Sequence, residues 1–166
     1  MGLLDFIKKL GGEDGPSEPP DFSSMSRDEL DRQFTPSRWE KLQYSDRCEC
    51  VRELERRFAR EQGRPAKDIR FVPMEGGTFG GWSKADDCIY VNDTLVSDGC
   101  FTIKGHMTDP QPSAPFQIYD TVAHEGYHAY QSYALEHPEV HADKAQLEEW
   151  RLNSAEGFPK GVYEDN

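Results

Sequence analysis

Two histidines and a glutamate stand at a spacing that suits a catalytic metal. His124, Glu125 and His128 form the pattern His-Glu-x-x-His within a segment of helical character. Side chains four residues apart share one face of a helix, so both imidazoles can bind one Zn²⁺. Glu125 beside that face can take a proton from a metal-bound water, which then attacks a carbonyl polarised by the same metal. The spacing predicts metal-assisted hydrolysis, and its alternative is an accidental pattern on an ordinary helix.

A catalytic zinc usually takes three protein ligands, so a third is needed. A metzincin would have glycine and histidine where this chain has Gln131 and Ala134, which excludes that subclass. A second predicted helix has one narrow face of small and polar residues that permits close packing: Ala142, Ala145, Gln146, Glu149 and Asn153. We expect Glu149 to be the third metal ligand and Asn153 to orient a ligating histidine. Glu148 competes for the ligand role, and the alternative for both glutamates is an ordinary solvated helix charge.

The segment His124-Glu-Gly-Tyr-His128, followed by Glu149 and Asn153, resembles the gluzincin arrangement, in which a glutamate from a second helix completes the zinc site. The neighbouring segments His-Ala-Tyr-Gln and Glu-Glu-Trp-Arg-Leu-Asn are similar to compact zincin domains of bacterial polymorphic toxins, secreted effectors and mobile-element proteins. The resemblance covers residues 68–155. It implies a zinc-dependent peptidase that acts on a protein or peptide substrate, with the motif glutamate as general base. It also implies an inhibitor or immunity protein as a partner.

The same resemblance implies an edge strand ahead of the active helix, on which an extended substrate pairs backbone to backbone. Cys88–Val91 is the predicted edge strand, and an internal strand without a ligand role is the alternative. Gly80, Gly81 and Trp82 precede it and are candidates for shaping a side-chain pocket, with Trp82 as a simple core residue the alternative. The residue that stabilises the oxyanion is left unassigned among three candidates: His141, Tyr133 and Tyr163.

The elements that must position these residues indicate an α+β fold. A capping box at Ser26-Arg-Asp-Glu29 begins a short helix, and Thr35-Pro36 begins the longest helix, over 36–62. The charged residues of that long helix are interpreted as a solvated face: Arg52, Glu53, Glu55, Arg56 and Arg57. The remaining predicted elements are strands at 68–72, 88–91 and 101–103 and helices at 116–136 and 138–155. Together they predict a minimal zincin with a small antiparallel or mixed sheet, a long N-terminal helix and a two-helix zinc core.

The periodicity of the active helix separates a buried stripe from a polar one. The predicted buried stripe consists of Val122, Gly126, Ala129 and Tyr133, and the neighbouring polar stripe of Thr121, His124, His128 and Gln131. Glycine is about 1 kcal/mol less favourable than alanine inside a helix. Gly126 therefore predicts that another backbone element approaches the helix closely at this point.

The length and the net charge of the chain limit the number of domains and the classes of partner that we expect. The 166 residues favour one domain, and we expect a flexible segment at 1–25, a single zincin-like metallopeptidase domain at 26–160 and an acidic tail at 161–166. A net charge of −12 repels phosphate backbones, which argues against nucleic acid as a partner. The chain lacks a run of about 18 apolar residues and a secretory signal, so stable membrane insertion is not expected. The predicted location is the cytoplasm, or outside the cell by a signal-peptide-independent route.

The cysteines do not have the spacing of a zinc knuckle, and the expected state is reduced, buried thiols: Cys48, Cys50, Cys88 and Cys100. Two other functions stay open. One is a catalytically inactive, zinc-stabilised binding or regulatory module of a mobile element, although such a site has no need of the base Glu125. The other is an interaction protein that works through the charged helix at 36–62.

Overall fold

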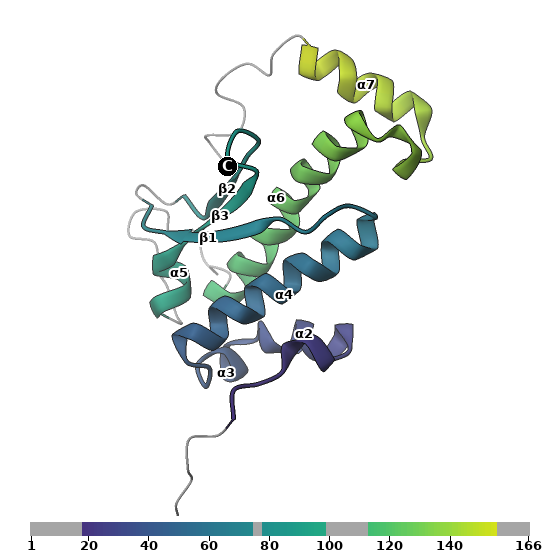
Figure 1. Ribbon diagram of the computed structural model, residues 1–166. Helices are drawn as coiled ribbons and strands as arrows, with labels where there is room; N and C mark the ends of the chain where they lie inside the picture. The colour runs from purple at the N-terminus through teal and green to yellow at the C-terminus, as the bar shows by residue number, and fades with distance from the viewer. Residues whose placement is uncertain (1–17, 75–77, 99–112, 156–166) are drawn as a thin grey trace, which may run out of the picture.

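A small sheet lies beside two long helices in an α+β arrangement, which confirms the predicted fold class (Figure 1). The computed structural model describes residues 18–74, 78–98 and 113–155. The helices of this part of the chain are α2 (Arg27–Gln33), α3 (Pro36–Trp39), α4 (Tyr44–Gln62), α5 (Asp93–Asp98), α6 (Ala114–Glu136) and α7 (Lys144–Ala155). Short 3-10 turns are η1 (Phe22–Ser24) and η2 (Pro138–Val140), and the strands are β1 (Asp68–Val72), β2 (Gly80–Ser83) and β3 (Cys88–Asn92).

The sheet is mixed, with strand order β1-β3-β2. The predicted strands β1 and β3 pair in parallel, with Asp68 opposite Cys88, and β2 pairs antiparallel to β3, with Gly80 opposite Val91. Strand β2 was not among the predicted strands, and it contains the three residues that we named as candidates for shaping a side-chain pocket: Gly80, Gly81 and Trp82. The expected strand at 101–103 lies outside the described residues.

The N-terminal helices differ from the prediction at one corner. The capping box is present, since Ser26 Oγ accepts from the Glu29 backbone N–H at 3.2 Å and Glu29 Oε2 accepts from the Ser26 N–H at 2.7 Å. The predicted single helix over 36–62 is wrong, because the chain turns between α3 and α4. Trp39 at this turn is fully buried, and its carbonyl accepts a hydrogen bond from Arg47 Nε at 3.1 Å. Burial of the indole and this side-chain cap stabilise the break.

The predicted helix over 138–155 is also divided. Pro138 begins the η2 turn, and α7 begins only at Lys144. The Asp143 carboxylate accepts hydrogen bonds from the backbone N–H groups of Ala145 and Gln146 at 3.0 and 3.1 Å. An aspartate in this position satisfies the first free amides of a helix, so it sets the start of α7.

The core lies where α4, α6 and the sheet meet. Its fully buried apolar side chains come from every layer: Leu30, Trp39, Val51, Leu54, Ile89, Val91, Leu95, Val96, Ile118 and Val122. Phe22 is also buried, and Arg57 Nη2 donates to the Met25 carbonyl at 2.8 Å. Packed structure therefore begins inside the segment 1–25 that we predicted to be flexible.

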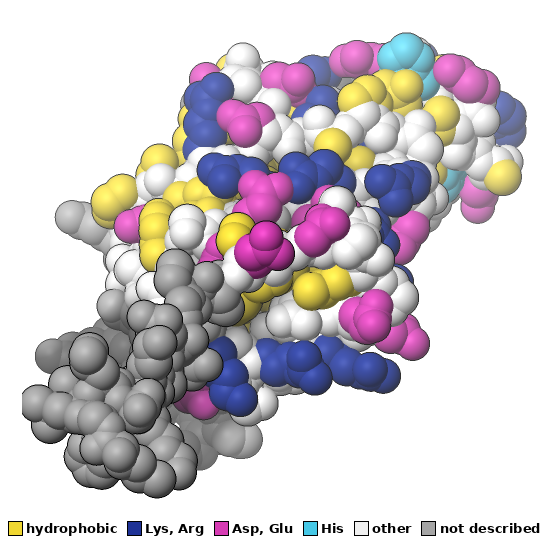
Figure 2. Space-filling view, turned by 60° about the horizontal axis from the view of Figure 1, so that its bottom comes forward, with side chains coloured by type: hydrophobic (Ala, Val, Ile, Leu, Met, Phe, Trp, Pro, Cys, Tyr) yellow, Lys and Arg dark blue, Asp and Glu magenta, His cyan; other side chains and the backbone are white. Residues whose placement is uncertain are grey.

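The charged surface is mixed in sign. Figure 2, which turns the lower side of Figure 1 forward, shows lysine and arginine side chains interspersed with aspartate and glutamate. Ion pairs along α4 link Arg56 to Glu53 at 2.8 Å and Arg57 to Glu53 at 2.6 Å. Among the described helices, none has the length and hydropathy needed to cross a membrane.

Candidate functional site

The candidate site lies on α6, a helix that begins after Ser113 with Pro115 in its first turn. Val122, Gly126 and Ala129 are buried as the periodicity predicts, and Ile118 is buried with them. Two residues differ from the prediction, since Tyr133 of the expected buried stripe is only half-buried and Thr121 of the expected polar stripe is buried. A neighbouring face of the helix carries His124, which is exposed, and His128, which is half-buried. The apolar stripe therefore fixes the rotation of the helix so that both imidazoles reach the surface.

The two imidazoles converge on one point. Nε2 of His124 lies 3.0 Å from Nε2 of His128, and the two ring planes are inclined by 84°. Two nitrogens bound to one tetrahedral zinc at about 2.05 Å stand roughly 3.3 Å apart. A small opening of the pair is thus enough to admit the ion, and both atoms are potential metal ligands.

The side chain of Gln131 contacts the His128 ring at Nδ1, the nitrogen that does not face His124. Its Oε1 atom lies 3.1 Å from Nδ1 of His128. Because an amide oxygen only accepts hydrogen bonds, Nδ1 carries the proton, which leaves the Nε2 lone pair directed at the candidate metal position. Periodicity placed Gln131 on the polar stripe, but the supporting role had been predicted for Asn153 instead.

Glu125 faces the side of α6 that adjoins the sheet. Residues one turn before and after it both meet strand β2. A Cβ built on Gly80 would lie 2.6 Å from Cγ2 of Thr121, and Ala129 shares a pocket with Trp82. Glu125 is half-buried between these two contacts. Helical spacing therefore places Glu125 between the histidine face of α6 and the residues that meet the edge of the sheet.

Gly126 lies against a buried ion pair from α4 and the residues that follow it. Glu55 and Arg64 are both fully buried, with Nη1–Oε1 and Nη2–Oε2 distances of 2.6 and 3.0 Å. A Cβ on Gly126 would stand 3.0 Å from Arg64 Nη2 and 3.2 Å from Glu55 Oε2. The predicted approach of another backbone element at this glycine is wrong, because the groups that lie close to it are the side chains of Arg64 and Glu55.

Two of the glutamates that we interpreted as part of a solvated face are buried. The exposed fraction of Glu53 is 3% and that of Glu55 is 0%. Each has arginine partners, which is the usual condition for burying a carboxylate. A charge pattern along one helix cannot reveal partners such as Arg64, which comes after the helix ends.

The predicted third ligand stands apart from the histidines. Glu149 is exposed on α7, and Glu148 is exposed and paired with Arg151 at 2.6 Å. Across the described ranges, no group of three histidine, cysteine, aspartate or glutamate side chains is placed to hold one metal ion. The structure thus brings together His124 and His128 but not Glu149.

The face of α7 that packs on α6 differs from the predicted one. Leu147 is buried, and the Trp150 ring lies 6.1 Å from that of Tyr127 and 6.2 Å from that of Tyr130. Most of the small and polar face expected there is exposed: Ala142, Ala145, Glu149 and Asn153. Packing of an indole buries more apolar area than packing of alanines, which explains this rotation of α7.

Strand β2, and not the predicted Cys88–Val91 segment, forms the sheet edge beside the active helix. The segment Cys88–Val91 belongs to β3, which is central because it pairs with both neighbours. Gly80 is required at the edge, since a Cβ there would stand 2.4 Å from the Tyr90 carbonyl oxygen. Gly80, which weakens the sequence pattern for a strand, is the residue that lets β2 approach α6, because its missing Cβ would stand 2.6 Å from Thr121 Cγ2.

Other reactive groups stand away from this face. The thiols of Cys48, Cys50 and Cys88 are buried and free, and burial raises the pKa of the Cys50 thiol. Of the oxyanion candidates, His141 Nδ1 lies 2.7 Å from the Tyr130 hydroxyl, and Tyr133 stacks on His137 with centroids 4.2 Å apart. Tyr163 and Cys100 lie outside the described residues.

No family model, curated protein or solved structure matches this chain.

Proposed function

We propose that this chain is a zinc-dependent peptidase that hydrolyses a peptide bond with Glu125 as general base. The observation that carries the proposal is the convergence of His124 and His128, whose Nε2 atoms lie 3.0 Å apart on an accessible face beside Glu125. A structural zinc site needs no base next to its ligands, whereas a hydrolytic site does.

The donor atoms on this face suit zinc. Two neutral imidazoles with convergent Nε2 atoms are typical zinc ligands, and the Gln131 amide sets the tautomer of His128. The sequence resemblance proposes Glu149 as the third ligand. Because Glu149 is exposed on α7 and stands apart from the histidines, α7 would have to move for its carboxylate to reach the zinc. When bound, zinc supplies Lewis acidity, which lets a water lose its proton near neutral pH and polarises a substrate carbonyl.

The residues of this chain would then divide the remaining work. An oxygen of the Glu125 carboxylate accepts the proton of the attacking water and delivers it to the leaving amine. The outer edge of β2 offers unpaired backbone groups to an extended peptide, because β2 has only one strand neighbour in the described sheet. Such a peptide would run past Glu125, since β2 meets α6 on both sides of that residue.

Zinc content and cleavage of a peptide library test the proposal together. The wild-type chain, Glu125→Gln and His124→Ala would be purified and compared by metal analysis and by mass spectrometry of the library products. Glu139→Gln is the matched control, because Glu139 is exposed on the η2 turn and lies outside the site. We expect one zinc per chain in the wild type and in Glu125→Gln, with cleavage lowered by about 100-fold to 10,000-fold in the latter.

Each other result has a definite meaning. Zinc that is retained without any cleavage by the wild type would favour the zinc-stabilised binding or regulatory module. A freshly purified chain without stoichiometric zinc would favour the interaction protein. Wild-type cleavage in Glu125→Gln would remove Glu125 from the mechanism.

A further inference from the structure

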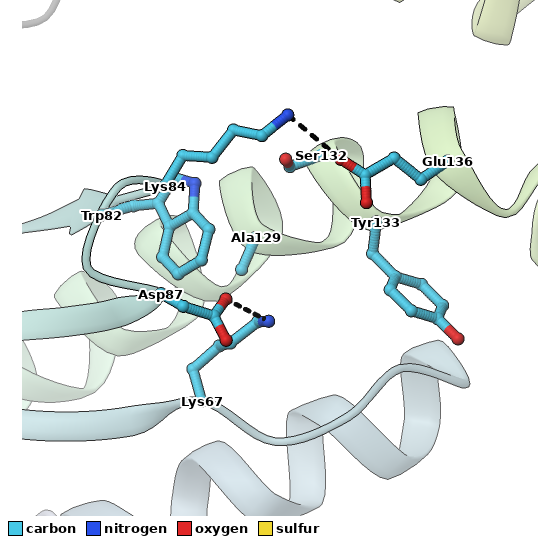
Figure 3. Close-up of a pocket in the computed structure, with 8 residues that line it drawn as sticks. All are labelled: Lys67, Trp82, Lys84, Asp87, Ala129, Ser132, Tyr133 and Glu136. Carbon is cyan, nitrogen blue, oxygen red and sulfur yellow. Dashed lines mark hydrogen bonds and ion pairs between the residues drawn. The ribbon is translucent and has the colours of Figure 1, made fainter.

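A pocket of 260 Å³ opens between α6 and the β2–β3 hairpin (Figure 3). The indole of Trp82 and the ring of Tyr133 stand on opposite sides of it, and Ala129 lies behind them. Sites for drug-sized ligands span about 300–1,000 Å³, so this pocket suits a single side chain. The small residue at 129 leaves the space between the two rings open.

The charges around the pocket are already paired. Lys67 Nζ lies 2.6 Å from Asp87 Oδ1, and Lys84 Nζ lies 3.2 Å from Glu136 Oε1. The lining thus contains two positive and two negative groups, and each has a partner across the rim. A charged ligand entering this space would have to compete with these pairs. A neutral aromatic group would contact the Trp82 indole, over which Lys67 Nζ lies 5.4 Å from the ring centroid. It would also contact the edge of Tyr133, whose ring stacks on His137.

The pocket shares a face of α6 with Glu125. Ala129 and Ser132, which line the pocket, follow Glu125 by four and seven residues, and these intervals return to the same side of a helix. Trp82 enters the pocket from β2, the strand at the sheet edge. A peptide paired with that edge directs every second side chain to the α6 side of the sheet, which is the side of Trp82.

We propose that this pocket receives an aromatic side chain of a peptide lying along β2, and that it sets the side-chain preference of the chain. The identity of the peptide as a substrate rests on the proposed function. Binding in the pocket requires neither zinc nor the carboxylate of Glu125, so the two proposals can fail separately.

Binding of capped amino acids tests the pocket directly. N-acetyl-phenylalanine amide, N-acetyl-arginine amide and N-acetyl-glutamate amide would be titrated into zinc-free Glu125→Gln protein, with the backbone amide NMR signals of Ala129 and Ser132 as the readout. We expect saturable shifts with the phenylalanine derivative and at least about tenfold weaker binding of both charged derivatives.

Two variants locate the binding site. Ala129→Leu fills the space and should weaken binding of the phenylalanine derivative by about tenfold or more. Trp82→Ala removes the ring on the opposite side of the pocket and should also weaken binding of the phenylalanine derivative. This second variant keeps the test available if Ala129→Leu fails to fold. Ala145→Leu is the matched control, since Ala145 is exposed on α7, and it should bind as the parent does.

Three results would overturn the proposal. They are equal or stronger binding of a charged derivative, unchanged binding in both pocket variants, and no shift with any derivative at its solubility limit. If a peptide library is cleaved, an aromatic preference at one position that disappears in Ala129→Leu would support the assignment, and a preference unchanged by that variant would contradict it. Absence of zinc binding would refute the peptidase and leave these binding results standing.

Discussion

The amide oxygen of Gln131 lies 3.1 Å from Nδ1 of His128, on the other side of the imidazole from the Nε2 atom that meets His124. This contact orients the ring and sets its tautomer within one turn of a single helix. With this tautomer, Nε2 of His128 is an acceptor and His124 Nε2 donates to it. For both Nε2 atoms to bind zinc, the proton of His124 would have to lie on its Nδ1 instead.

Gln131→Leu should weaken zinc binding, because the ring of His128 would lose its orienting acceptor. Loss of such a supporting contact typically lowers metal affinity by about tenfold to 100-fold. Competition titration against a chelator measures the effect. Asn153→Leu is the informative comparison, since the sequence had suggested Asn153 for this role. If only the Asn153 variant loses affinity, the assignment to Gln131 is wrong.

Substitution of the two exposed glutamates on α7 identifies the third ligand. Glu149→Gln should lower zinc affinity by at least about tenfold, whereas Glu148→Gln should leave it unchanged. Both residues are exposed, so neither change should alter the free energy of unfolding by more than about 0.5 kcal/mol. Equal zinc affinity in the two variants and the wild type would exclude both glutamates as ligands.

Gly126→Ala should destabilise the fold by about 1–3 kcal/mol, measured by urea unfolding. In an open helix, the same substitution would be stabilising by about 1 kcal/mol, so the sign of the change is diagnostic. The reason is the locked ion pair of Glu55 and Arg64, which cannot move aside without losing a buried hydrogen bond. Gly81→Ala is the control, because a Cβ there meets nothing within 4 Å. A stabilised Gly126→Ala variant would contradict this account.

Acid should destabilise the fold partly through Glu53. Burial alone would raise the pKa of this carboxyl, but hydrogen bonds from Arg57 and Arg56 outweigh burial and hold the pKa below its ordinary value of 4.5. As the pH falls from 4.5 through that lower pKa, the unfolded state binds more protons and stability is lost.

The pH dependence of urea unfolding between neutral and acidic pH checks this prediction. Glu53→Gln should be less stable than the wild type at neutral pH and should lose less stability on acidification. Glu40→Gln, a change at an exposed residue, should follow the wild-type profile. Parallel profiles for Glu53→Gln and the wild type would show that another group carries the acid sensitivity.

The features that could be predicted from the sequence are those that depend only on residues a few positions apart in the chain. The convergence of His124 and His128 follows from helical periodicity, and the capping box at Ser26 joins groups three residues apart. The periodicity of Val122 and Ala129 predicted the buried side of α6 in the same way. Gly126 indicated that some group packs closely on α6, because a glycine inside a helix is costly unless a larger side chain has no room there.

Only the tertiary structure decided which distant segments meet. Strand pairing made β2 the edge of the sheet, although glycine has a low strand propensity. Packing of Trp150 against α6 left Glu149 exposed to solvent. Burial of Glu55 depended on Arg64, nine residues later and beyond the end of α4. These outcomes depend on competition among many apolar and polar contacts between segments, and local propensity does not encode that competition.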